Sequence, residues 1–172
     1  MHERLYEMNL LDRCEWRGVQ HAPHLSKPMV RWRGAFEAEL RHEVTLVRRL
    51  APELTISSPS GKPNTRGAIE LAASLLSQDV GRGMEGVRQA YRAFWCEGQD
   101  LSDPPVLSRL AKAGGAQPAT ISPGEASPMK IVSQWENEWR ATGEPGVPLL
   151  VTPDSGVLSG LASLDDIRRF LT

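Results

Sequence analysis

Apolar residues recur at helical spacing through most of the chain. Residues 30–50 carry one such stripe between charged residues, made of Trp32, Phe36, Leu40, Val44 and Val47. A stripe of this kind predicts an amphipathic helix with one buried face. The same spacing predicts further helices over residues 2–12, 65–78, 84–96, 104–113 and 129–142.

Alternating or β-type residues occur in two places. Residues 14–20 put Cys14, Trp16 and Gly18 on one face, which predicts a strand. Residues 149–152 predict a second strand, which a turn joins to a short return strand at residues 157–159. Ser163 is followed three residues later by Asp166, so we expect a capping box at the start of a last helix.

Glycine and proline divide these elements. Residues 80–83 contain two glycines and predict a break between two helices, and residues 116–128 are rich in Pro, Ser, Gly and Ala and predict an irregular loop. The order is therefore helix, strand, several helices, hairpin and helix. That order predicts an α/β fold in which helices far outnumber strands.

Composition narrows the classes of partner. The 172 residues suit one domain, or one domain with an insertion, and the net charge of −1 gives no long-range attraction to nucleic acid or to a membrane surface. No apolar run approaches the roughly 20 residues of a membrane span. The first residues are charged and lack the apolar core of a signal peptide. We therefore expect a cytoplasmic protein with no nucleic-acid or membrane partner.

Few residues carry candidate chemistry. Cys14 and Cys96 lie far apart in the sequence, and two free buried thiols are expected, although a disulfide between them stays open. His21 and His24 form a His-x-x-His pair, but a metal site needs three or four ligands and no further cluster has the right spacing. The sequence thus predicts no catalytic residue, no metal site and no bound cofactor.

A proline precedes the predicted hairpin, in the sequence Gly-Val-Pro at residues 146–148. Proline cannot donate to a strand ladder, so it is confined to strand starts, edges and bends. Together with residues 63–68, 90–111 and 160–161, this segment resembles the DsbA-like thioredoxin family. That family includes predicted dithiol-disulfide isomerases, 2-hydroxychromene-2-carboxylate isomerases and kappa-class glutathione transferases. The resemblance covers residues 60–172 and, more weakly, residues 1–25.

The resemblance implies a thioredoxin-like fold with an inserted all-helical domain. Residues 1–28 and 129–172 would form the thioredoxin-like part, and residues 29–128 the insert. It also implies a cis Val147–Pro148 bond at the lip of a cleft, where the main chain of Val147 binds an extended peptide or glutathione. Asn64 would lie on the rim of that site. A plain proline at a strand start and a helix cap explain Pro148 and Asn64 without any function.

The function that the resemblance implies is thiol-disulfide oxidation or isomerisation, by thiolate attack on a disulfide held against the proline loop. The sequence has no Cys-x-x-Cys, and it lacks the strand and active-site turn that the family places before its first helix. That segment could be lost from the sequence, discarded by the protein or supplied by another chain. Two alternatives follow: a glutathione-dependent isomerase or transferase, and a catalytically silent binding module. The expected partners are a thiol or disulfide substrate, or glutathione as a co-substrate, and a homodimer stays open.

Overall fold

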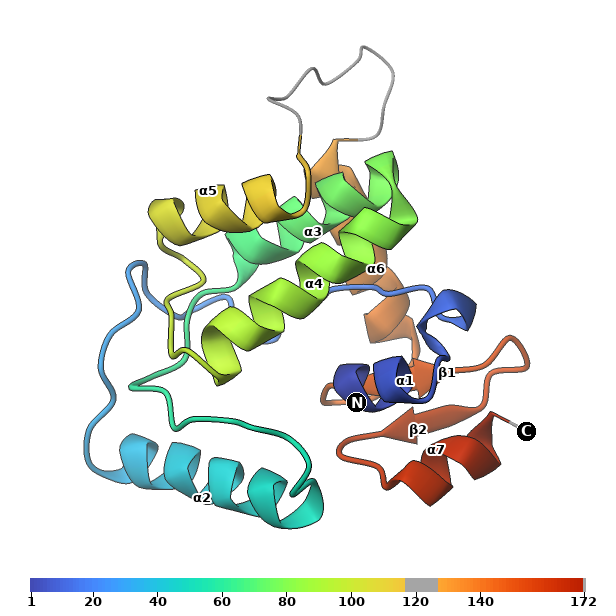
Figure 1. Ribbon diagram of the computed structural model, residues 1–172, viewed down its shortest axis with the longest axis horizontal. Helices are drawn as coiled ribbons and strands as arrows, with labels where there is room; N and C mark the ends of the chain where they lie inside the picture. The colour runs from blue at the N-terminus through green and yellow to red at the C-terminus, as the bar shows by residue number, and fades with distance from the viewer. Residues whose placement is uncertain (117–126, 172) are drawn as a thin grey trace.

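The chain is described here by a computed structural model that covers residues 1–116 and 127–171. Within these residues it forms seven α-helices, one 3₁₀ turn and one two-stranded antiparallel sheet (Figure 1). The helical elements are α1 (His2–Glu7), η1 (Leu11–Arg13), α2 (Ala35–Leu50), α3 (Arg66–Gln78), α4 (Val80–Trp95), α5 (Pro104–Ala113), α6 (Pro128–Ala141) and α7 (Leu164–Phe170). The strands are β1 (Leu149–Val151) and β2 (Val157–Ser159). In the described part of the chain, no helix is long and apolar enough to cross a membrane.

The helix α3 lies at the centre of the helical part, where it packs against α4, α5 and α6. The closest approach is at Gly83 of α4, where a Cβ atom would lie only 2.6 Å from Cα of Leu76. The predicted break at residues 80–83 is wrong, because α4 begins at Val80. Asp79 caps this helix by accepting a hydrogen bond from the Arg82 N–H at 2.8 Å, and Gly83 lets the helix lie close to α3.

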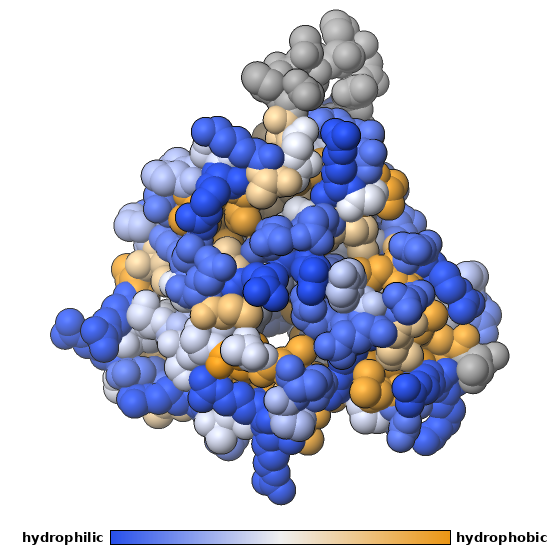
Figure 2. Space-filling view, viewed as in Figure 1, coloured by the Kyte–Doolittle hydropathy of each residue, from blue (hydrophilic) through white to orange (hydrophobic). Residues whose placement is uncertain are grey.

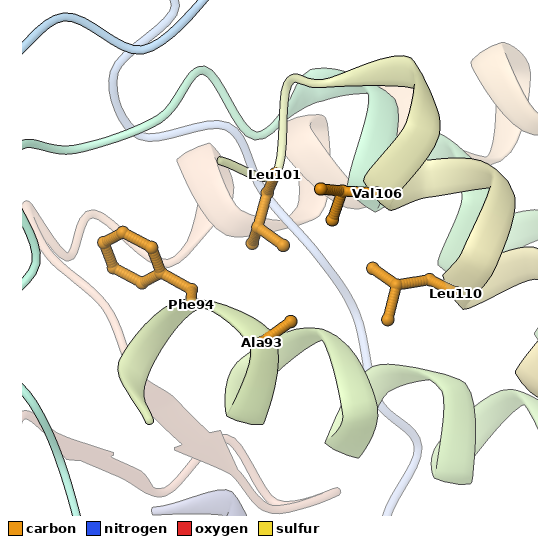
Figure 3. Packing of buried hydrophobic residues seen from close by; sticks show 5 residues of the cluster. All are labelled: Ala93, Phe94, Leu101, Val106 and Leu110. Carbon is orange, nitrogen blue, oxygen red and sulfur yellow. The ribbon is translucent and has the colours of Figure 1, made fainter. Parts of the chain in front are cut away.

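Two apolar clusters hold the helices together. The first joins the C-terminal part of α4 to α5 and consists of Ala93, Phe94, Leu101, Val106 and Leu110 (Figure 3). The second lies between α3 and α6 and consists of Ile69, Ala73, Val132 and Trp135. These buried faces match the apolar stripes of the sequence, which is why the helices fold at nearly the predicted positions.

The predicted strand at residues 14–20 is wrong. The segment is extended, yet among the described residues it forms no ladder with another strand. Its alternation has another cause, since Trp16 packs edge-on against Trp135 of α6 at a ring distance of 5.7 Å. Gly18 is buried where a Cβ atom would meet the side chain of Ile69 at 2.8 Å. The segment therefore lies across helices, and one face is apolar because the helices cover it.

A third cluster packs the hairpin against the two ends of the described chain. Leu5 of α1 and Ile167 of α7 are buried together with Ala162, and Leu150 and Leu158 of the hairpin pack against them. Figure 1 shows α1 and α7 gathered around the hairpin. The strands therefore cover these helices with one face only.

The last helix begins as predicted. Ser163 accepts a hydrogen bond through Oγ from the Asp166 N–H at 3.1 Å, and Asp166 accepts one from the Ser163 N–H at 3.3 Å. The capping box is thus confirmed. The predicted loop at residues 116–128 lies mostly outside the described residues.

The predicted thioredoxin-like α/β fold with an inserted helical domain is contradicted. Such a fold is built on a central sheet, whereas the described residues contain a mostly helical arrangement and one antiparallel hairpin near the C-terminus. The physical reason is that residues 14–20 contact helices and have no strand partner. The division into one part of residues 1–28 and 129–172 and an insert of residues 29–128 stays a prediction. Helix α6 packs against α3, which lies within the predicted insert.

The guanidinium of Arg4 ties three distant segments together. Its side chain is only 4% exposed. It donates hydrogen bonds to the Leu50 carbonyl at the end of α2 at 2.7 Å, to Glu53 Oε1 at 2.9 Å and to the carbonyl of Ala162 before α7. A buried charge is stable only when it is paired and hydrogen-bonded, and all three nitrogens of this group have acceptors.

The first helix also packs against α4. The ring of His2 lies 5.4 Å from that of Tyr91, and both ring nitrogens of His2 are buried with no hydrogen-bond partner among the described residues. Beside it, Arg88 of α4 forms an ion pair with Glu3 at 3.1 Å. Burial lowers the pKa of His2, and the Glu3 carboxylate only partly opposes this effect.

This burial predicts a loss of stability in mild acid. The folded chain protonates His2 only at a lower pH than the unfolded chain, which takes up this proton near the ordinary histidine pKa of about 6.5. The buried His2 ring therefore contributes fully to the free energy of unfolding above the unfolded-state pKa, and this contribution is lost as the pH falls through that pKa. We expect urea titrations to show a smaller pH dependence between about pH 7.5 and about pH 5.5 in His2→Phe than in the wild type. Equal slopes in the two proteins would contradict the burial of a neutral ring.

Candidate functional site

The strand β1 has one edge that no other strand covers. It pairs antiparallel with β2, with Leu149 opposite Ser159, Leu150 opposite Leu158 and Val151 opposite Val157. Figure 1 shows β2 on one side of β1, and among the described residues the sheet has no third strand.

The hydrogen bonds of the hairpin show which groups face this open edge. The Gly160 N–H donates to the Pro148 carbonyl at 2.9 Å, and the Thr152 N–H donates to the Gly156 carbonyl at 3.0 Å. Hydrogen-bonded and non-hydrogen-bonded pairs alternate along an antiparallel ladder. The N–H and C=O groups of Leu149 and Val151 therefore point away from β2, and no described residue bonds to them.

The two faces of the hairpin differ in the same alternating way. Leu150 and Leu158 point into the third cluster, whereas Val151 and Val157 lie on the other face and are 54% and 39% exposed. Val147, which precedes the strand, is 48% exposed. An open main-chain edge thus lies beside an uncovered apolar face, and this combination is the main candidate site of the molecule.

Sequence reasoning selected the entrance to this strand. The Val147–Pro148 peptide bond is cis, as the resemblance implies. The Lys27–Pro28 bond is also cis, which the sequence did not indicate. The role of Val147 and Pro148 in binding stays a prediction. The sequence analysis did not identify the outward N–H and C=O groups of Leu149 and Val151. The alternation of residues along β1 is the signal that could have identified them.

The segment before β1 is tied to residues near the start of the chain. His21 Nε2 lies 3.2 Å from the Pro145 carbonyl, and the His21 ring contacts that of Trp139 at 6.1 Å. The indole N–H of Trp139 is buried and has no partner among the described residues. These contacts hold the approach to Val147 between α6 and the end of the extended segment that begins at Cys14.

Asn64, the third predicted site residue, is 5% exposed and holds a loop in place. Its Oδ1 accepts from Gln20 Nε2 at 2.8 Å and from the Arg66 N–H at 3.2 Å. Its Nδ2 donates to the Leu25 carbonyl at 2.7 Å and to that of Pro23 at 3.3 Å. These bonds use the full hydrogen-bonding capacity of the amide. The N-cap of α3 is Thr65, so the predicted cap at Asn64 is wrong by one residue. Asn64 reaches the approach to Val147 only indirectly, because Gln20 precedes His21 in the chain.

The two thiols do not meet. Cys14 lies against the third cluster, and burial raises the pKa of its thiol. Cys96 follows α4 and donates its S–H to the Thr55 carbonyl at 2.9 Å. Both cysteines are free, as expected, but they are half-buried and not buried as predicted. A thiol with a raised pKa holds less thiolate at neutral pH, so Cys14 is a poor nucleophile.

The histidine pair gives no metal centre in the described residues. His21 and His24 are exposed, and no group of three or more His, Cys, Asp or Glu side chains in residues 1–116 and 127–171 could hold a metal ion. His21 instead contacts Trp139 and the Pro145 carbonyl.

Comparison with known proteins finds no matching family model, no matching curated protein and no matching solved structure. The proposed function therefore rests on the geometry of the hairpin.

Proposed function

We propose that this chain binds an extended peptide along the open edge of β1. The observation that carries the proposal is the set of outward N–H and C=O groups on Leu149 and Val151, which have no partner among the described residues. An extended peptide can add to such an edge as a further strand, because the main-chain groups of the two segments then satisfy one another. Only three residues form β1, so the added segment is short.

The side chains next to this edge favour apolar residues in the ligand. Val157 lies one strand away from the open edge, whereas the side chains of Leu149 and Val151 lie on the exposed face of β1 itself. An added strand would place every second side chain beside them. We therefore expect a peptide with β-branched residues at alternate positions to bind best.

The resemblance of residues 146–148 to the substrate-facing loop of thiol-disulfide oxidoreductases suggests the chemistry of the ligand. Peptides that carry a thiol or a disulfide are the proposed partners, and glutathione is the shortest of them. Cys14 has a raised pKa, and Cys96 has no second cysteine near it in the sequence. The proposed role of these 172 residues is therefore binding, with no thiol attack by either cysteine.

A pair of proline variants tests the proposal. Val151 and Val157 face each other as a non-hydrogen-bonded pair, so their N–H groups point to opposite outer edges of the hairpin. Val151→Pro removes a donor from the edge of β1, and Val157→Pro removes the matched donor from the edge of β2. The probe is a blocked pentapeptide of sequence Val-Thr-Cys-Thr-Val, titrated by NMR in its reduced form and as a mixed disulfide with glutathione.

We expect Val151→Pro to weaken binding of the pentapeptide by about tenfold, the effect of one or two lost main-chain hydrogen bonds, and Val157→Pro to leave it unchanged. Reduced glutathione should bind more weakly than the pentapeptide, because it is too short to span both outward positions. Insulin added to the same samples with a thiol reductant should be reduced no faster than without the protein. Equal affinities for the two proline variants would contradict the proposed edge.

A further inference from the structure

A pocket opens where the two ends of the described chain meet. It has a volume of about 310 Å³ and is lined by Met8, Leu10, Arg13, Arg168 and Leu171. Figure 2 shows hydrophobic surface bordered by hydrophilic surface in the part of the view where Figure 1 places α1, the hairpin and α7. The three apolar lining residues are half-buried and belong to the margin of the third cluster.

Within residues 1–116 and 127–171, the charged side chains that line this pocket are both arginines. The side chain of Arg13 is exposed, and its guanidinium has no hydrogen bond or ion pair with another described residue. Arg168 is exposed as well and pairs with Asp165 at 3.1 Å, one helical turn earlier on α7. No carboxylate of a described residue lines the pocket itself. The apolar side chains thus lie inside, and the two guanidinium groups lie on the solvent side.

We propose that this pocket binds a small amphiphilic carboxylate, such as a fatty acid of about eight carbons. The carboxylate would pair with Arg13 and Arg168, because a planar guanidinium matches the two oxygens of a carboxylate. The hydrocarbon tail would cover Met8, Leu10 and Leu171 and so complete the margin of the cluster.

The two halves of the pocket together select this class of ligand. A short carboxylate such as acetate gains the charge contacts but leaves the apolar lining in water. An alcohol with the same tail covers that lining but leaves the guanidinium groups with water. The volume is at the low end of the range of roughly 300–1,000 Å³ for ligand pockets, so a short chain fits better than a long one.

The test is a calorimetric titration of the 172-residue chain with octanoate, octanol and acetate. We expect octanoate to bind with a Kd of about 100 µM, and octanol and acetate to bind at least about tenfold more weakly. Arg13→Gln should weaken octanoate binding by about tenfold. Arg33→Gln is the matched control, since Arg33 is also an exposed arginine with no partner among the described residues, and it should leave the affinity unchanged.

A second measurement places the ligand. With methyl-labelled methionine, octanoate should shift the NMR signal of the Met8 methyl group in the wild type, and Arg13→Gln should need about ten times more octanoate for the same shift. Octanol binding as tightly as octanoate would overturn the proposal. An equal loss of affinity in Arg13→Gln and Arg33→Gln, an unmoved Met8 signal at saturation, or no heat at millimolar octanoate would do so too.

Discussion

Replacing Arg4 with methionine should lower the free energy of unfolding by about 3 kcal/mol. The change fills the buried position with an apolar side chain and removes the donors to Leu50, Glu53 and Ala162. The two carbonyl groups then lose their charged partner, and the carboxylate of Glu53 loses its ion pair. Buried acceptors without donors cost more than the hydrogen bonds contribute while they are present. Urea denaturation followed by tryptophan fluorescence measures the difference.

Two further variants separate the charge from the geometry. Arg4→Lys keeps the positive charge, but one ammonium group cannot reach three acceptors in three directions, so it should recover only a minor part of the loss. Arg33→Met removes an exposed arginine that has no partner among the described residues, and it should change stability by less than about 0.5 kcal/mol. Full recovery of stability in Arg4→Lys would show that the three hydrogen bonds of the guanidinium group do not stabilise the fold.

The next largest effect is expected at Gly83, where alanine should destabilise the chain by about 2 kcal/mol. Alanine favours a helix over glycine by about 1 kcal/mol, so helix propensity alone predicts the opposite sign. The added Cβ would lie 2.6 Å from Cα of Leu76, and main chain cannot move aside as a side chain can. The helices α3 and α4 must then separate, which opens the packing on both sides of the contact.

Gly81 provides the matched control on the same helix. It is exposed, and a Cβ atom there would meet only Asp79 Oδ1, at 3.4 Å. Gly81→Ala should therefore stabilise the chain by about 1 kcal/mol. Opposite shifts of the urea midpoint in the two variants would support the close contact of α3 and α4. A gain of stability in both variants would show that main-chain contact does not limit how closely α3 and α4 pack.

The start of a helix could be predicted from the sequence wherever a few neighbouring residues determine it. The capping box at Ser163 is a property of a few neighbouring residues, and so is the start of α5, where Asp103 is the N-cap and Pro104 the first helical residue. The start of α2 was placed too early, because the apolar stripe continues upstream through Trp32. The helix begins only after Gly34, whose φ of 61° is outside the helical region.

The sheet could not be predicted in the same way. Alternation in residues 14–20 reports that one face is covered, but it does not report whether strands or helices cover it. Here the side chain of Trp135 covers Trp16, and the main chain of the segment has no strand partner among the described residues. A resemblance that assumes a sheet at this place therefore leads to the wrong fold class.

The candidate site was predicted in part. The sequence selected Val147 and Pro148 at the start of the exposed strand. It also predicted Asn64 as the N-cap of α3, but the N-cap is Thr65, and Asn64 lies one residue before it. The sequence did not indicate that Leu149 and Val151 present the open edge, because the pairing register depends on the return strand as well. The pocket lined by Arg13 and Arg168 was missed too, since its walls come from opposite ends of the chain.

The hydrogen bonds of Arg4 also constrain the order of folding. They span 46, 49 and 158 residues of sequence, so they belong to the most non-local contacts in the molecule. During synthesis α1 leaves the ribosome long before Ala162, and Arg4 stays hydrated until Ala162 has emerged as well. The loop-closure entropy of a contact rises with its separation, and the native environment of Arg4 can form only after residue 162 has left the ribosome.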